Sequence, residues 1–355
     1  MKRIILPLAA CAIMSASCEK KAETGFSNDE VQGMTAVELK IDDMSTKALT
    51  DNGAETRFNS IQVFLYGIDG EGNQKYDSYY SFDSDKTDNS THTIYIDLAK
   101  EDITSYRTVV YVNHPAITPG NTLEDWSLFA NEKTDNFQMV GQCTNTVEEL
   151  STSKKINVAA VRQCSKITVK EIAVDWKNSA NSLKSLKLKG MYLMDVPGVF
   201  KNNFDISASI ADDHSLWQNK KGHTSSSHDA LLYDEIKSVK VTGQAPYKTR
   251  HIFYGYISAI NDYYTTEEWK PSGTRLIIEA EFDGKACYYA IGINGADGST
   301  PLSDIRNTHF IFDKITITKP GSDQPYSALP EESGITVSVS VAPWDNIEND
   351  NFIIQ

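Results

Sequence analysis

The sequence lacks long hydrophobic runs, a surplus of basic residues and low-complexity composition, and each absence argues against a class of protein. Among 355 residues there are 34 Lys and Arg against 48 Asp and Glu, so the formal net charge is −14. Nucleic acids and anionic membrane surfaces are bound through basic patches, so we expect neither as a partner. Gly and Pro, at 20 and 11 residues, are too few for a collagen-like or low-complexity chain. Beyond residue 17, no apolar stretch is long enough to cross a bilayer as a helix.

Catalytic and cofactor-binding motifs are also missing. The sequence contains no G-x-S-x-G, Walker A, H-E-x-x-H or Rossmann pattern. His223 and His228 flank a Ser-rich stretch, which favours a solvated loop over a metal site. The acidic segment 83–89 lacks the central Gly and terminal Glu of an EF-hand loop, which favours a turn between strands. We therefore expect no catalytic residue, no metal and no cofactor, and a protein that is not an enzyme.

The first residues have the pattern of a bacterial lipoprotein signal. Lys2 and Arg3 precede an apolar run over 4–14, and small residues occupy 15–17. They lead directly into Cys18, which resembles the lipobox cysteine that is lipidated and becomes the new N-terminus. We therefore expect a signal peptide over 1–17 and a lipid such as palmitate on Cys18. A plain signal peptide followed by an incidental cysteine is the alternative.

Three further cysteines remain in the body of the chain: Cys143, Cys164 and Cys287. At most one disulfide can form among them, and one thiol is then left over. Burial as small hydrophobic side chains is the favoured alternative. No C-x-x-C pair or matching His spacing accompanies them, so a zinc site is not expected.

Alternation of apolar and polar residues dominates from Phe58 onward and predicts an all-β fold. Most expected strands are rich in Val, Ile, Thr, Tyr and Phe, the residues that suit a half-buried sheet. They cover 61–65, 93–97, 107–113, 167–174, 183–193, 236–242, 251–257, 274–282, 286–293 and 310–318. A short helix is expected at 122–130. Many short strands separated by turns indicate two β-sandwiches, with a boundary near the polar stretch 152–155.

Two further strand patterns lie at the ends of this run. Near the N-terminus, Val37, Leu39 and Ile41 alternate with polar residues, and a polar, Gly-containing stretch over 50–58 follows. Such a stretch is expected to be exposed to proteases, and Arg57 is its basic residue. An ordinary linker that happens to contain an arginine is the alternative.

The C-terminal pattern is a strict alternation after the polar stretch 321–333. Its apolar residues are Ile335, Val337, Val339 and Val341, followed by Trp344 and by a last apolar patch of Phe352, Ile353 and Ile354. A final strand of the C-terminal sheet would explain this alternation equally well.

Taken together, these features resemble the fimbrillin family, the type V pilins of Bacteroidales. The resemblance rests on the lipobox, the strand that ends before Arg57, the V-x-V-x-V-A-P-W tail, and the segments 162–167 and 306–310. It implies two tandem transthyretin-like, Greek-key β-sandwich domains with few short helices. They would cover 58–153 and 154–355, the latter including a donor-strand tail over 334–355, and 18–57 would be a propeptide.

The resemblance also implies a mechanism of assembly. An arginine-specific, trypsin-like protease would cut between Arg57 and Phe58 and release the strand that carries Val37, Leu39 and Ile41. The tail of another copy, or of another fimbrial subunit, would then fill the gap by β-augmentation. Because such a head-to-tail contact does not close on itself, it builds a filament.

The expected product is a stalk subunit of a cell-surface fimbrium that supports adhesion to host or bacterial surface ligands. Its precursor would be an outer-membrane lipoprotein that meets the membrane only through its lipid. The tip or anchor subunit of the same fimbrium is one alternative. The other is a monomeric, surface-anchored lipoprotein that binds glycans through exposed aromatics such as Tyr264 and Trp269.

Overall fold

A computed structural model of the chain shows an almost purely β architecture in the residues that it describes. In these ranges the regular elements are β-strands, apart from the short helix α1 (Val147–Ser153). The all-β class predicted from alternation is therefore confirmed. The described residues are 33–43, 55, 57–83, 91–118, 126–128, 131–178, 180–181, 184–201, 217–219, 231–258, 260, 262–263, 266, 268–293, 306–328 and 334–343.

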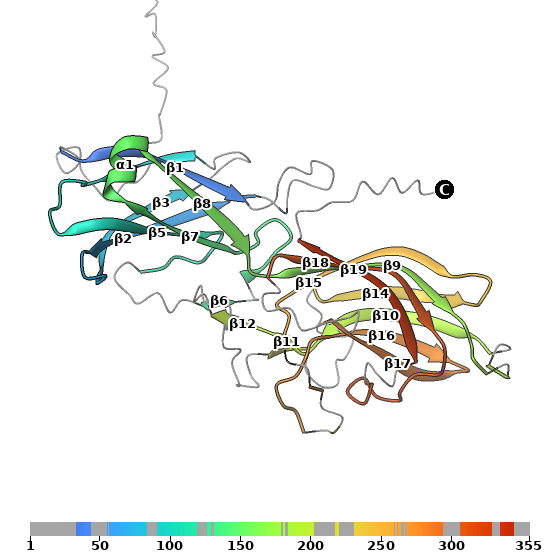
Figure 1. Ribbon diagram of the computed structural model, residues 1–355. Coiled ribbons are helices and arrows are strands. Elements are labelled where there is room, and N and C mark those ends of the chain that lie inside the picture. Colours follow the sequence, from blue (N-terminus) through green and yellow to red (C-terminus); the bar gives the residue numbers. More distant parts are fainter. Residues whose placement is uncertain are drawn as a thin grey trace, which may run out of the picture.

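The N-terminal part is one seven-stranded sheet with the order β3-β2-β5-β7-β8-β1-β4 (Figure 1). Neighbouring strands in this sheet are antiparallel, except that β1 and β8 run parallel. The strands are β1 (Thr35–Asp43), β2 (Ser60–Asp69), β3 (Gln74–Asp83), β4 (Thr91–Ile96), β5 (Ile103–Val112), β7 (Met139–Thr146) and β8 (Lys155–Arg162).

This sheet folds over on itself and encloses its own core. β7 and β8 pair over only three residue pairs, which end at Gly141. A Cβ atom at Gly141 would lie 2.3 Å from the carbonyl oxygen of Ala159, so this close approach requires glycine. The hydroxyl of Tyr80 on β3 donates to the carbonyl oxygen of Tyr95 on β4, although these strands lie at opposite ends of the sheet order. The two ends of the sheet are therefore brought together.

The C-terminal part contains two four-stranded sheets, β14-β10-β16-β17 and β15-β9-β18-β19 (Figure 1). Two short pairs, β6 with β12 and β11 with β13, lie beside them. The strands are β6 (Trp126–Leu128), β9 (Ser165–Val174), β10 (Leu186–Met194), β11 (Val196–Pro197), β12 (Val199–Lys201), β13 (Trp217–Gln218), β14 (Tyr233–Val241), β15 (Tyr247–Gly255), β16 (Arg275–Phe282), β17 (Lys285–Gly292), β18 (Thr308–Ile317) and β19 (Ile335–Pro343).

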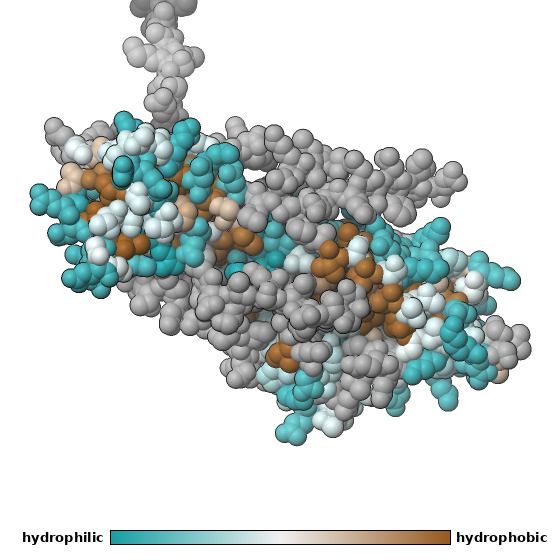
Figure 2. Space-filling view, in the orientation of Figure 1, coloured by the Kyte–Doolittle hydropathy of each residue, from teal (hydrophilic) through white to brown (hydrophobic). Residues whose placement is uncertain are grey.

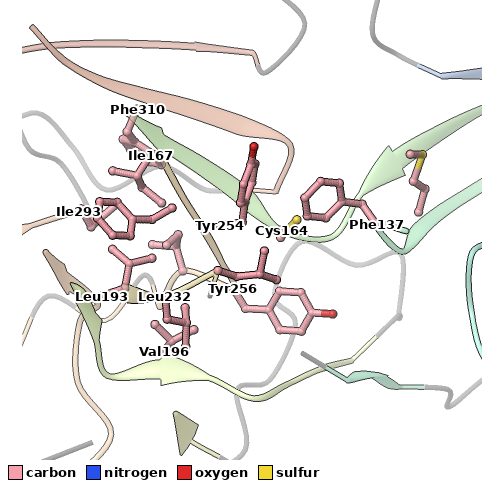
Figure 3. Close-up of a cluster of buried hydrophobic side chains, with 14 of the residues drawn as sticks. Phe137, Cys164, Ile167, Leu193, Val196, Leu232, Tyr254, Tyr256, Ile293 and Phe310 are labelled. Atoms are coloured by element: carbon pink, nitrogen blue, oxygen red, sulfur yellow. The ribbon is translucent and has the colours of Figure 1, made fainter. Parts of the chain in front are cut away.

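Both parts contribute to one continuous cluster of buried hydrophobic side chains. Where they meet, Phe137 lies before β7 and Tyr254 lies on β15, and their ring centroids are 4.9 Å apart (Figure 3). Hydrophilic residues cover the outer edges of both parts, and hydrophobic ones gather towards the middle of each (Figure 2). The junction is thus a packed core, which positions residues of the first part against the second.

Every expected strand overlaps an observed one, but the helix expected at 122–130 is wrong where it can be checked. Trp126–Leu128 forms strand β6 because its backbone pairs with β12, which lies far away in the sequence. The helix that does form, α1, begins with a capping box in which Thr146 and Glu149 bond each other's backbone N–H groups.

The passage from the first part to the second comes after strand β8, and the expected boundary between residues 153 and 154 precedes that strand. The polar stretch 152–155 lies at the end of α1 and leads directly into β8. β8 pairs with β1 and β7, so it completes the first sheet. The chain enters the sheets of the second part after Arg162, where β9 begins.

Candidate functional site

Strand β1 lies inside the first sheet, with a neighbour on each side. It pairs antiparallel with β4, from Thr35 opposite Ile96 to Lys40 opposite Thr91. On its other side it pairs parallel with β8, from Glu38 opposite Lys155 to Asp43 opposite Ala160. Both backbone edges of β1 are therefore used, and its removal would expose one edge of β4 and one of β8.

The apolar face of β1 is completely buried. Val37 and Leu39 are 0% exposed and Ile41 is 1% exposed, and all three belong to the main hydrophobic cluster. The residues between them, Glu38 and Lys40, are exposed. The alternation seen in the sequence thus separates a core face from a solvent face.

The connection from β1 to β2 places Arg57 at the surface. The Arg57 side chain is exposed, whereas Phe58 next to it is 9% exposed and joins the core. Asn113 holds this point in place, because its side-chain amide donates to the carbonyl oxygen of Arg57 at 2.7 Å. The side-chain oxygen of Asn113 accepts from the backbone N–H of Asn59, also at 2.7 Å. The chain is therefore anchored just after Arg57, while the Arg57 side chain faces solvent.

Strand β19 has the opposite environment from β1. It pairs antiparallel with β18, from Thr308 opposite Pro343 to Ile317 opposite Ile335, and it is the last strand in its sheet order among the described residues. Its apolar residues are only partly buried: Ile335, Val337 and Val339 are half-buried, and Val341 is 41% exposed. The same alternation that buries β1 therefore leaves β19 at a partly solvated edge.

Several expected site residues fall outside the described residues. These are Cys18, Trp344, Phe352, Ile353, Ile354 and Tyr264; the loop with His223 and His228, for which no metal site was expected, also lies outside them. Of the aromatic pair suggested for glycan binding, Trp269 is half-buried and its ring lies 5.6 Å from that of Trp217, edge to face. Such packing within the protein restricts the face that Trp269 could offer to a sugar.

The three cysteines of the body are free thiols. Burial raises the pKa of the Cys143 thiol to about 11 and that of Cys164 well above its ordinary value. Cys287 is also buried, and its pKa is raised for the same reason. The interpretation of these residues as small buried hydrophobes is therefore confirmed for Cys164 and Cys287, and Cys143 is partly buried.

The described residues contain neither a metal-binding cluster nor a membrane-spanning helix. No group of three or more His, Cys, Asp or Glu side chains there could hold a metal ion. Within the same part of the chain, no helix has the length and apolar character needed to cross a membrane.

Sequence reasoning missed the residues that hold the connection around Arg57. In the sequence Asn113 is only the last residue of an expected strand, and its positive φ of 57° has no signal beyond the tolerance of Asn for this conformation. Glu55, two residues before Arg57, belongs to the polar stretch that the sequence predicts to be exposed. Its carboxylate instead makes an ion pair with Lys166 of β9 at 3.0 Å.

Solved structures share this fold. Two candidate cell adhesion proteins from Parabacteroides distasonis align with TM-scores of 0.57 and 0.56, at 12% and 16% identity; each alignment covers 88% of this chain and 97% or 99% of the other. A fimbrilin from Porphyromonas gingivalis aligns with a TM-score of 0.55 at 14% identity, over 88% of this chain and 97% of that one.

No protein-family model and no curated protein matches the sequence significantly. The similarity to the solved structures therefore confirms the expected resemblance to fimbrillins at the level of the fold. These neighbours are described as cell adhesion or fimbrial proteins.

Proposed function

We propose that the chain is a structural subunit of a cell-surface fimbrium, of the fimbrillin family, which polymerises when its strand β1 is removed and replaced. The observation that carries this proposal is the combination of a buried, central β1 with an exposed Arg57 in the connection that follows it. A cut after Arg57 would leave β1 attached to the body only by non-covalent contacts.

The energetics favour replacement of β1 over an empty groove. Full burial of Val37, Leu39 and Ile41 contributes roughly 1.5–3 kcal/mol for each side chain, and this contribution is lost when β1 leaves. The facing edges of β4 and β8 would also lose their hydrogen-bond partners. A new strand with the same alternation restores both, which gives the cut subunit a strong tendency to bind one.

Strand β19 is suited to be that new strand in a second copy. It leaves only β18 when it departs, because it stands at the edge of its sheet. In the groove it would gain a second neighbouring strand, and its half-buried Val337 and Val339 and exposed Val341 would become fully buried. The exchange therefore increases both the backbone pairing and the apolar burial of the tail.

The role of the subunit within the filament follows from strand β1 near its N-terminus and strand β19 near its C-terminus. A subunit that both loses a strand and donates one can be extended in both directions, which is what a stalk subunit requires. The lipid on Cys18 belongs to the precursor, an outer-membrane lipoprotein, and would leave with β1. The mature subunit, beginning at Phe58, would then be held at the surface by its neighbours, where the filament supports adhesion.

Processing of the purified full-length chain tests this proposal. Treatment with an arginine-specific protease is expected to give a new N-terminus at Phe58 by mass spectrometry, release of β1, and SDS-resistant ladders. Arg57→Ala is expected to remain intact and monomeric. Arg57→Lys is the matched control, because trypsin still cuts it while the arginine-specific protease does not. A chain that is cut cleanly after Arg57 but remains monomeric would overturn the proposal.

A further inference from the structure

Glu55 anchors the connection that contains Arg57 to the second part of the molecule. Its carboxylate oxygens lie 3.0 and 3.1 Å from the ammonium of Lys166 on β9. The hydroxyl of Tyr254, on β15, donates to the same carboxylate. The guanidinium of Arg162, at the end of β8, donates to the backbone carbonyl oxygen of Glu55 at 3.3 Å. One acidic residue thus draws together three strands.

The residues that receive Glu55 are deeply buried. The Lys166 side chain is 5% exposed, and Arg162 and Tyr254 are 1% and 6% exposed. Arg162 also donates to the side-chain oxygen of Asn307 at 3.1 Å, which fixes its orientation. Burial and the nearby charge of Glu55 raise the pKa of Tyr254, so its hydroxyl remains a hydrogen-bond donor. The pocket formed by Arg162, Lys166 and Tyr254, here the carboxylate pocket, offers donors and positive charge in a site shielded from water.

A buried cation is costly when its anionic partner is taken away. Glu55 belongs to the segment that a cut after Arg57 would separate from the body, whereas the carboxylate pocket belongs to the body. Release of β1 therefore removes the carboxylate and leaves the pocket in place. A strand that refilled only the apolar groove would restore the hydrophobic contacts but not this charge partner.

We propose that the carboxylate pocket is a recognition site for an acidic side chain of the incoming strand, occupied by Glu55 before processing and by a carboxylate from a second copy of this chain afterwards. The inference rests on the proposed strand exchange and adds its charge specificity. The incoming strand that binds most tightly would then need two features: the apolar alternation that fills the groove and one acidic residue that enters the carboxylate pocket.

Strand register identifies the acid. β1 runs parallel to β8, with Ile41 opposite Val158 and Asp43 opposite Ala160, so a strand that continued in this register would place position 45 opposite Arg162. If Val337, Val339 and Val341 take the places of Val37, Leu39 and Ile41, the residue at that point is Asp345.

The alternation of residues along the two strands indicates the same acid. Arg162 continues the inward alternation of Val158 and Ala160 on β8, and Asp345 continues the alternation of the valines in the tail. Glu348 and Asp350, the acids that follow it, fall on the opposite alternation. Asp345 is therefore the acid of the tail that would face the carboxylate pocket.

A competition between synthetic tail peptides tests the proposal. The full-length chain is cut with an arginine-specific protease in the presence of equal amounts of two mass-labelled peptides that span residues 334–355. One has the natural sequence and the other carries Asp345→Asn. Capture is measured by mass spectrometry of the purified complex. A peptide with Asp350→Asn, which removes the same charge on the other alternation, is the matched control.

The natural peptide is expected to be captured about 10-fold or more in preference to Asp345→Asn, because a hydrogen-bonded charge pair is lost. Against the Asp350→Asn peptide, its preference is expected to stay below about 2-fold, because a solvated charge contributes little. The preference for Asp345 is expected to shrink in chains carrying Lys166→Met. Tyr254→Phe, which keeps the ring and its packing, provides the same comparison if Lys166→Met impairs folding.

Equal capture of the natural and Asp345→Asn peptides would overturn the carboxylate recognition while leaving strand exchange intact. So would a preference for Asp345 that persists unchanged in both pocket variants. Failure to capture any peptide after a clean cut and release of β1 would overturn the strand exchange as well.

Discussion

Buried Glu132 is expected to make the stability of the protein depend on pH in an unusual direction. Glu132 is 4% exposed, and burial raises the pKa of its carboxyl to about 7. The backbone and side chain of Gln138 donate to it at 2.9 and 3.1 Å, and the Tyr256 hydroxyl donates at 2.6 Å. These three donors favour the ionised form, but the desolvation of the charge outweighs them.

The sign follows from comparing the folded and unfolded chains. In the unfolded chain the carboxyl ionises near its ordinary pKa of 4.5, and in the folded chain near 7. Between these values unfolding releases a proton, so the contribution of Glu132 is greatest below pH 4.5 and is lost as the pH rises to 7. The difference between these two pKa values corresponds to about 3 kcal/mol as an upper limit.

Urea denaturation of the wild type and of Glu132→Gln, followed by tryptophan fluorescence between pH 4 and 8, measures this contribution. The amide has nearly the same shape and does not titrate, so the other ionisable groups cancel in the difference between the two proteins. We expect the free energy of unfolding of the wild type to fall relative to that of the variant by up to about 3 kcal/mol across this range. Glu235→Gln, at an exposed position on β14, is the control. Parallel pH profiles for the wild type and Glu132→Gln would refute the reasoning.

Two further substitutions test the packing around the exchangeable strand and in the second part. Leu39→Ala is expected to lower the free energy of unfolding of the uncut chain by about 2–5 kcal/mol, because the side chain is fully buried. Lys40→Ala, on the exposed face of the same strand, should change it by less than about 0.5 kcal/mol. Equal effects of the two substitutions in urea denaturation would contradict the burial of β1. Asp195→Asn should lower the free energy of unfolding by about 3–5 kcal/mol in the same assay, because Asp195 and Arg275 form an ion pair with both side chains 0% exposed. A decrease below about 1 kcal/mol would show that the pair is accessible to water.

Strands were predictable from the sequence where local alternation and tertiary burial agree. Ile61, Val63 and Leu65 are all 0% exposed on β2, as their spacing indicates. The stretch 122–130 was wrongly predicted as a helix because Trp126 and Phe129 are spaced as on one helix face. The conformation of Trp126–Leu128 is instead decided by pairing with β12. A local pattern carries no information about a neighbour that lies about 70 residues away in the chain.

The candidate site was predictable in part for a similar reason. The apolar residues of β1 and the basic residue that follows were visible as pattern and composition. The anchoring of the connection was not, because the contacts of Glu55 with Lys166 and Tyr254 span 111 and 199 residues of sequence. Helix α1 is a different case, since the spacing of Thr146 and Glu149 is a local capping signal that could have been recognised.

The contrast between β1 and β19 shows that an alternating pattern does not determine whether a strand lies inside a sheet or at its edge, and this difference matters for function. Both strands place apolar residues at every second position, yet β1 has two neighbours and β19 has one in the described part of the chain. The difference lies in the other face. β1 carries Glu38, Lys40 and Asp42 there, whereas β19 has Thr336, Ser338 and Ser340 at the corresponding positions and contains no charged residue. Edge strands are normally protected from pairing by charges. An edge strand without them, adjacent to a partly exposed valine face, is prepared to pair again, and a groove vacated by β1 in a second copy offers it two edges instead of one.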